Sequence, residues 1–389
     1  MISNNRNGAG RTLLVLSLIP ILATFFGGYS LSLGGFGFSP DRVLVIVLLP
    51  YLVLWIAARG IKSKDIVVGI FLFYAFVAAY INNGPSWAKN FFIYAGPMVY
   101  LLYVYRLNVD SKRYELIVCA FSVIFSGLSV LLFFFGKTAF PVLFEGDRFR
   151  FLFFEPNIYG AAAALMFMLF LPYASRSLFR KFVLLLLLVS VFISYSKGPM
   201  VALLLGLLVY YNRSGINLKS VVAVLAFAAV AVVVYLSGAV DATIEGFSRE
   251  SASNVRLDIV YSALTAFAHN LMIGVGPLSF GATNQDLLLS LGSESEKNLW
   301  IGNLQIAYLH DFGTIGFILI NYIFFVFLKS NVKQMSNPYV CARLSGFLVI
   351  YVSAQFTTTH TLGLFWVALA VAALPTITLT KKSREEVLP

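Results

Sequence analysis

The sequence predicts an all-α protein that crosses a membrane many times, and three observations support this class. Hydrophobic residues make up 59% of the 389 residues and charged residues only 12%, whereas soluble proteins carry about 25% charged residues. The mean hydropathy is +0.86. The apolar residues lie in long runs that short polar segments separate. This composition excludes a soluble secreted enzyme, a disordered scaffold and a nucleic-acid-binding domain.

A helix that spans a membrane needs about 20 mostly apolar residues. Twelve runs have roughly this length, although several are shorter, and we expect about 12 transmembrane helices in a single integral membrane domain over residues 1–389. The runs cover residues 12–33, 43–58, 66–82, 89–105, 115–136, 157–174, 181–196, 198–211, 219–239, 303–328, 340–357 and 361–379.

The charged residues predict the orientation of these helices. If the N-terminus is cytoplasmic, 19 of the 28 basic residues lie on the inner side and 12 of the 17 acidic residues on the outer side. Cytoplasmic loops carry an excess of Lys and Arg. The formal net charge of +11 is therefore a topology signal and does not indicate nucleic-acid binding. An even number of spans places both termini in the cytoplasm.

Two outer segments are longer than a tight connection needs, and they cover about 137–156 and 240–298. Loops of this length usually have a function, so we expect the working face on the outer side. Within the second loop, apolar residues at positions 257, 260, 261, 264 and 267 follow helical spacing. This spacing predicts a surface helix near 255–270.

The first outer segment places charges among aromatic residues. Arg148, Arg150 and Glu155 lie within a run of phenylalanines, and Asn157 follows. One interpretation is an interfacial loop whose arginines reach lipid headgroups. The other is a site in which arginine binds an anion and glutamate takes a proton. Glu155 directly precedes Pro156, so it could also be an acid that only stabilises a helix start.

Two further basic residues are candidates for binding an anion. Lys197 is the sole charge between Lys181 and Arg213 and lies in the polar turn 194–199. It could reach the membrane surface or bind an anion at the mouth of the bundle. Arg256 begins the predicted surface helix, and arginine suits bidentate phosphate contact. The glycine-rich segment 274–281 follows but lacks the setting of a nucleotide-binding fingerprint.

The last candidate segment is residues 302–316. Helical spacing places Asn303 and His310 on one face, together with Gly313. Asp311 could pair with His310, either as a structural pair or as part of a catalytic site. Gly313 and Gly316 would allow close helix packing.

Other chemistry is not indicated. The sequence has no Walker loop, HExxH helix or GxSxG elbow. The two cysteines, Cys119 and Cys341, lie inside apolar runs, so a disulfide framework or CxxC metal site is not expected. We therefore expect neither a metal nor another cofactor.

The order of these motifs resembles that of the bacterial O-antigen polymerases (Wzy-type), which share a superfamily with the O-antigen ligases. The resemblance covers roughly residues 140–330. Segment 148–157 is similar to the family's loop of an arginine, aromatic residues and a Glu-Pro that enters a helix. Segment 194–198 resembles the family's Ser-x-Ser-Arg/Lys-Gly turn, with Lys197 in the basic place.

The third element of the resemblance is the large outer loop and the helix that follows it. Arg256, the glycine-rich segment and the run 303–316 occur in the family's order. The ligase branch has His-Asn at the head of the last motif, where this sequence has Gly302 and Asn303. The missing histidine favours a polymerase.

The resemblance implies a multi-helix fold of the lipid-dependent (GT-C-type) glycosyltransferases, in the bacterial inner membrane with a periplasmic active face. Donor and acceptor would be glycans linked to undecaprenyl pyrophosphate, and transfer would invert the anomeric carbon. A chain-length regulator and a flippase would be partners, and nucleic acid would not. The implied site roles are diphosphate binding by Arg148, Arg150, Lys197 and Arg256, proton transfer by Glu155 or His310, and lining of the site by Asn157 and Asn303.

Two other functions remain open at this point. An O-antigen ligase uses the same donor but transfers the glycan to lipid A core. A transporter of polysaccharides or lipid-linked sugars could also use twelve helices, and it should show an internal repeat of its two halves. The sequence shows no such repeat.

Overall fold

The computed structural model describes residues 31–33, 36–38, 40–107, 111–146, 148–153, 155–213, 250–284, 301–357 and 361–375. The helices in this part of the chain are α2 (Pro40–Arg59), α3 (Ser63–Asn82), α4 (Trp87–Arg106), α5 (Ser111–Ala139), α6 (Pro156–Phe170), α7 (Leu178–Ile193), α8 (Lys197–Tyr211), α11 (Glu250–His269), α12 (Phe280–Thr283), α14 (Leu304–Val332), α15 (Pro338–Ser353) and α16 (Gly363–Ala372). Short 3-10 turns are η1 (Gly84–Ser86), η2 (Pro141–Leu143) and η3 (Leu171–Arg176).

Strands contribute little, and the predicted all-α class is confirmed. The two small antiparallel hairpins pair β1 (Leu31–Leu33) with β2 (Phe36–Phe38) and β3 (Phe144–Glu145) with β4 (Arg148–Phe149). Among the described residues, five helical segments are long and apolar enough to cross a membrane: Arg42–Arg59, Ser63–Asn82, Lys112–Gly136, Pro156–Arg176 and Leu304–Val332.

Ten of the twelve predicted spans coincide with helices, from α2 through α8 and from α14 through α16. The other two, 12–33 and 219–239, lie almost wholly outside the described residues. The end of the first one was wrong, because residues 31–33 form strand β1. The predicted helix near 255–270 is present as α11 and begins earlier, at Glu250.

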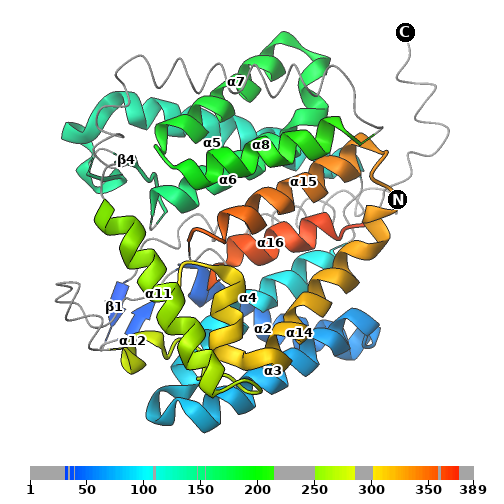
Figure 1. Cartoon of the computed structure of the whole chain (residues 1–389). Coiled ribbons are helices and arrows are strands. Elements are labelled where there is room, and N and C mark those ends of the chain that lie inside the picture. The colour runs from blue at the N-terminus through cyan, green and yellow to red at the C-terminus, as the bar shows by residue number, and fades with distance from the viewer. Residues whose placement is uncertain are drawn as a thin grey trace.

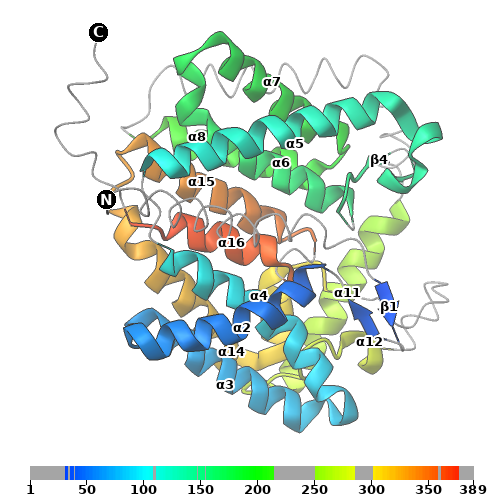
Figure 2. The ribbon, with the colours of Figure 1, turned by 180° about the vertical axis from the view of Figure 1, so that it is seen from behind.

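The helices form two groups with a central pair between them. Figures 1 and 2 show α5, α6, α7 and α8 on one side, α2, α3 and α4 on the other, and α15 with α16 in the middle. Small residues allow close packing in the first group. A Cβ on Gly206 of α8 would lie 2.7 Å from Val349 of α15, and one on Gly160 of α6 would lie 2.6 Å from Ser194 Oγ. Small residues have this role in membrane helix bundles.

Helix α14 breaks sharply at Gly313, where φ is 62° and ψ is −167°. The Asn321 side-chain amide donates to Gln305 Oε1 at 3.3 Å, although 16 residues would span about 24 Å along a straight helix. The two arms of α14 therefore fold back toward each other, as the yellow and orange ribbons in Figure 1 show. The expectation that positions 303 to 314 share one continuous helix face was wrong, because the helix ends its first arm before Gly313.

Basic residues gather at one end of the bundle, which we call the basic end. Two ion-pair groups lie there, Arg106 with Asp65 and Arg176 with Glu115. Lys64 lies over the ring of Phe327, near the end of α14. This grouping follows from the alternation of charged loops in the sequence. Which compartment each end faces stays a prediction.

Candidate functional site

Three helices begin close together at the opposite end, which we call the site end. They are α6, α8 and α14, and the segment 354–357 that follows α15 lies among them. A helix N-terminus presents free backbone N–H groups and the positive end of the helix dipole. The N–H groups at the start of α14 already donate to Asn303 and to the Ala354 carbonyl, so the starts of α6 and α8 provide the setting that favours an anion.

Arg148 connects two of these helix starts. It lies on β4, in the hairpin closed by Gly146, which has a φ of 64°. Its Nη2 donates to Asn157 Oδ1 at 2.8 Å and to Ser196 Oγ at 2.9 Å. Asn157 lies in the first turn of α6 and Ser196 is the N-cap of α8. The structure thus brings the first two sequence motifs together around one guanidinium group.

The turn between α7 and α8 is strained. Tyr195 has a φ of 46°, a conformation that costs a non-glycine residue about 1–3 kcal/mol and occurs often at functional sites. The Ser194 hydroxyl donates to the Val191 carbonyl at the end of α7, and the Ser196 hydroxyl donates to the Ser194 carbonyl. Lys197 follows as the exposed first residue of α8. The turn holds the Ser196 hydroxyl where Arg148 can bind it.

Glu155 is the N-cap of α6, but its side chain makes no capping hydrogen bond to that helix. Instead its Oε2 accepts a hydrogen bond from the Thr357 hydroxyl at 3.1 Å. Thr357 is buried, whereas Glu155 is half-buried. Glu155 therefore makes no side-chain cap, but a carboxylate at a helix start can still interact with the helix dipole, so its role as a helix-start acid or as a base stays a prediction.

The segment 354–357 joins the third helix start to the same place. Asn303 caps α14 by accepting from the backbone N–H groups of Gln305 and Ile306, both at 3.1 Å. Its side-chain amide donates to the Gln355 carbonyl at 3.4 Å. A Cβ on Gly198 of α8 would lie 3.3 Å from Phe356. The sequence analysis missed Thr357 and this segment, although the polar run Thr357-Thr358-Thr359-His360 that ends an apolar stretch was a signal.

Arg150 and Arg256, the other two arginines predicted to bind the diphosphate, do not share the contacts of Arg148 in the described structure. Arg150 donates through Nε and Nη2 to the Val142 carbonyl, at 3.1 and 3.0 Å, and so closes the loop that carries the hairpin. Arg256 lies in helix α11, but its side chain is outside the described residues. α11 packs on α14 through Ile259 and Ala263, whereas Leu257 and Tyr261 of the predicted apolar stripe are exposed.

The glycine-rich loop after α11 is part of the α14 break. The backbone N–H groups of Val275 and Gly276 donate to the carbonyls of His310 and Asp311, at 2.7 and 3.0 Å. On the other side of the break, Thr314 N–H donates to the Leu271 carbonyl at 2.8 Å. The loop therefore satisfies the backbone groups that the broken helix frees, as membrane interiors require. We call this arrangement the α14 joint.

Glycine is required on both sides of this joint. A Cβ on Gly274 would lie 2.5 Å from the Gly313 nitrogen, and a Cβ on Gly313 would lie 2.5 Å from Met272 backbone atoms. Both residues also have positive φ, 79° and 62°. The sequence suggested phosphate binding for the first glycine and helix packing for the second. In the structure, both allow the loop backbone to touch the backbone of α14.

His310 lies in the α14 joint and is fully buried. Its Nδ1 lies 2.7 Å from Asp311 Oδ1, and Asp311 Oδ2 accepts from the Tyr94 hydroxyl and the Leu278 N–H. No described contact joins this pair to Arg148 or Glu155. Among the described residues, no group of three His, Cys, Asp or Glu side chains could hold a metal ion.

A comparison with protein families supports the second and third motifs of the resemblance, whereas the first, at residues 148–157, lies outside the matched range. Residues 182–321, about a third of the chain, match the profile of the family described as O-antigen ligase. The match includes the turn that carries Ser196 and Lys197, the helix with Arg256 and the first arm of α14. A search of curated proteins found no match. The family match confirms, over residues 182–321, the resemblance to the superfamily of O-antigen ligases and polymerases.

Proposed function

We propose that the chain is a glycosyltransferase that joins oligosaccharide repeat units, each linked to undecaprenyl pyrophosphate, into a surface polysaccharide. The observation that carries this proposal is the pair of hydrogen bonds from Arg148 to Asn157 and Ser196, beside the carboxylate of Glu155. A cation fixed between two helix starts suits a diphosphate, and a neighbouring carboxylate suits the proton of an attacking hydroxyl.

The donor diphosphate would bind at the site end. Arg148, the Asn157 N–H of α6 and the first N–H groups of α8 would stabilise the negative charge that develops as the bond from the anomeric carbon to the diphosphate breaks, since Pro156 at the start of α6 has no N–H. Lys197, at the start of α8, and Arg256, on α11, would add positive charge there. The apolar helices would hold the lipid tail at membrane depth.

The acceptor would be a sugar hydroxyl on a second carrier-linked unit. Its oxygen would attack the anomeric carbon from the side opposite the diphosphate and invert the configuration. Glu155 would accept the hydroxyl proton, and general-base catalysis contributes about 10²–10⁴-fold. Thr357 would hold the carboxylate in position by donating to Oε2. The carrier diphosphate would leave with the bonding electrons.

One observation favours this reaction over that of a ligase, and another guides the choice of the residues that carry it out. Gly302 stands where the ligase branch has histidine, which favours a second repeat unit as acceptor instead of lipid A core. Arg150 and His310 already have structural contacts, with Val142 and Asp311 respectively. We therefore assign the reaction to Arg148, Glu155, Lys197 and Asn157. The site end would face the periplasm, in a bacterial inner membrane, where a flippase delivers substrate and a regulator sets chain length.

The test is a reconstitution of the purified chain in liposomes. The liposomes contain undecaprenyl-pyrophosphate-linked repeat units, no energy source, and in parallel samples either no further acceptor or lipid A core. We expect a ladder of longer lipid-linked glycans in both samples and no glycan on the core. Transfer to the core without a ladder would identify a ligase instead. Movement of intact units across the bilayer without any new glycosidic bond would identify a transporter.

A further inference from the structure

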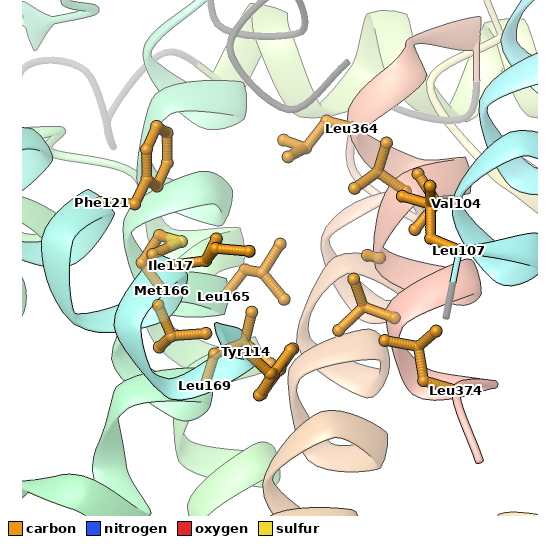
Figure 3. Close-up of a pocket in the computed structure, with 14 residues that line it drawn as sticks. Val104, Leu107, Tyr114, Ile117, Phe121, Leu165, Met166, Leu169, Leu364 and Leu374 are labelled. Carbon is orange, nitrogen blue, oxygen red and sulfur yellow. The ribbon is translucent and has the colours of Figure 1, made fainter. Parts of the chain in front are cut away.

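An apolar cavity lies between α4, α5, α6 and α16, toward the basic end. Its volume is about 70 Å³, several times the roughly 10–15 Å³ that one water molecule needs. Of its fourteen lining residues, Tyr114 alone carries a polar side-chain atom. Figure 3 shows Phe121 and Leu364 at one end of the cavity, and Tyr114 and Leu374 at the other. Apolar cavities of this kind stay dry and take apolar molecules, and a volume of about 70 Å³ holds only a short stretch of a hydrocarbon chain.

A buried cation lies beside the Tyr114 end of this cavity. Arg343 of α15 is 5% exposed, and its guanidinium carbon lies 6.0 Å from the centre of the Tyr114 ring. Within the described part of the chain, no carboxylate lies within 4 Å of Arg343, and neither its Nε nor the Tyr114 hydroxyl has a hydrogen-bond partner. Arg343 Nε and the Tyr114 hydroxyl are thus two buried donors that lack an acceptor among the described residues.

Arg343 differs in this respect from its neighbours at the basic end. Three other arginines at the basic end have carboxylate partners: Arg106 pairs with Asp65, and both Arg176 and Arg180 pair with Glu115. A buried charge without a partner costs several kcal/mol, and buried polar groups without a hydrogen bond are also costly. The described residues supply no carboxylate for Arg343, and a negatively charged group of a bound ligand would stabilise it.

We propose that Arg343 and Tyr114 bind the phosphate of an anionic membrane phospholipid, with a short stretch of one of its acyl chains in the adjoining cavity. Basic pockets between transmembrane helices are known to bind anionic headgroups, and guanidinium groups match phosphate oxygens. Leu169 of the cavity lies 13 residues beyond Pro156, or about 20 Å along α6. The lipid site is therefore separate from the proposed catalytic site at the other end.

A polyprenyl phosphate also has a phosphate group and an apolar tail. The experiment therefore distinguishes binding of a phospholipid from binding of a polyprenyl phosphate. The wild-type chain, in a detergent without phosphate, is mixed with dioleoyl phosphatidylglycerol, dioleoyl phosphatidylcholine or undecaprenyl phosphate, and bound lipid is counted by native mass spectrometry. We expect retention of phosphatidylglycerol in preference to phosphatidylcholine, and phospholipid phosphorus in the chain as purified. Arg343→Met should weaken phosphatidylglycerol binding about tenfold or more, since a charge-assisted hydrogen bond contributes about 1.5–3 kcal/mol.

Two further variants keep the test informative. Lys333→Met removes an exposed basic residue at the same end and should leave lipid binding unchanged. Ala368→Leu fills the cavity without a change of charge and should also reduce binding, so it serves if Arg343→Met does not fold. Equal binding by wild type and Arg343→Met, retention of undecaprenyl phosphate alone, or no bound phospholipid would overturn the proposal. Because the readout is lipid binding, none of these results bears on the proposed transfer reaction.

Discussion

The Arg148 site and the α14 joint looked alike in the sequence, because both contain glycines, charges and a polar segment next to apolar runs. In the joint, the carbonyls of His310 and Asp311 accept from the loop backbone, and the Asp311 carboxylate accepts from Tyr94 and Leu278. In the Arg148 site, the half-buried Arg148 and Asn157 meet the buried Ser196 at the starts of separate helices.

This difference separates a structural element from a candidate binding site. The joint is buried and its hydrogen bonds are local to two backbones that touch, so changes there should affect folding. In the Arg148 site, Arg148 and Glu155 of one loop contact Ser196 and Thr357, which are far along the chain, and no helix or strand needs these contacts in order to form. Changes there should affect activity at nearly unchanged stability. The predictions below test this division, beginning with the largest effect.

The largest effect is expected at the joint. Gly313→Ala places a Cβ 2.5 Å from the Met272 backbone at a positive φ, and strain together with overpacking should cost about 3 kcal/mol or more of folding free energy. Thermal unfolding in detergent measures it. Gly127→Ala on α5 is the matched control, since a Cβ there meets nothing within 4 Å. If Gly313→Ala is as stable as Gly127→Ala, the joint is not a required element.

The next effect is expected at Arg148. Arg148→Ala removes the cation that contacts Asn157 and Ser196, and loss of one donor to a developing negative charge typically lowers the rate about 10²–10³-fold. The measurement is the rate of chain extension per folded protein. Arg150→Ala, which removes the contacts to the Val142 carbonyl, is the control and should retain much of the rate. The reverse order of the two rates would place the diphosphate at Arg150.

A smaller effect is expected at His310. His310→Gln removes an imidazole that pairs with the buried Asp311, and an imperfectly satisfied buried group costs about 1–3 kcal/mol. Chain extension by the folded fraction should persist. The two measurements are the unfolding temperature and the activity at equal folded protein. Complete loss of activity at unchanged stability would make His310 a catalytic residue and end the contrast between the two regions.

The smallest effect on stability is expected at Gly302. A Cβ there meets Phe356 backbone atoms only at 3.9 Å, which is ordinary contact, so Gly302→His should unfold at nearly the wild-type temperature. It restores the histidine of the ligase branch beside Asn303. Transfer to lipid A core by this variant, measured in the same liposomes, would sharpen the distinction between the two branches. Loss of folding would show that the space beside Phe356 is needed.

The sequence predicted the helices well because each is a long apolar run. It also predicted Arg148, Asn157 and Lys197 as site residues, because charged and polar residues next to apolar runs of a membrane protein often have a function. It could not predict the break at Gly313, since the partners that stabilise the break come from residues 271–276. It also missed Thr357, whose contact with Glu155 joins positions 202 residues apart. Contacts of that range depend on packing that no local pattern contains.

The most direct test of the account compares two carboxylates of the same loop. Glu155→Gln keeps the shape and the hydrogen bond to Thr357 but cannot take a proton, whereas Glu145→Gln changes an exposed side chain on β3. The measurement is the rate of chain extension in liposomes at equal amounts of folded protein. We expect Glu155→Gln to lose about 10²–10⁴-fold with donor binding intact, and Glu145→Gln to extend chains at the wild-type rate. Near-normal extension by Glu155→Gln would contradict the assignment of the base, and with it the placement of the reaction at this end of the bundle.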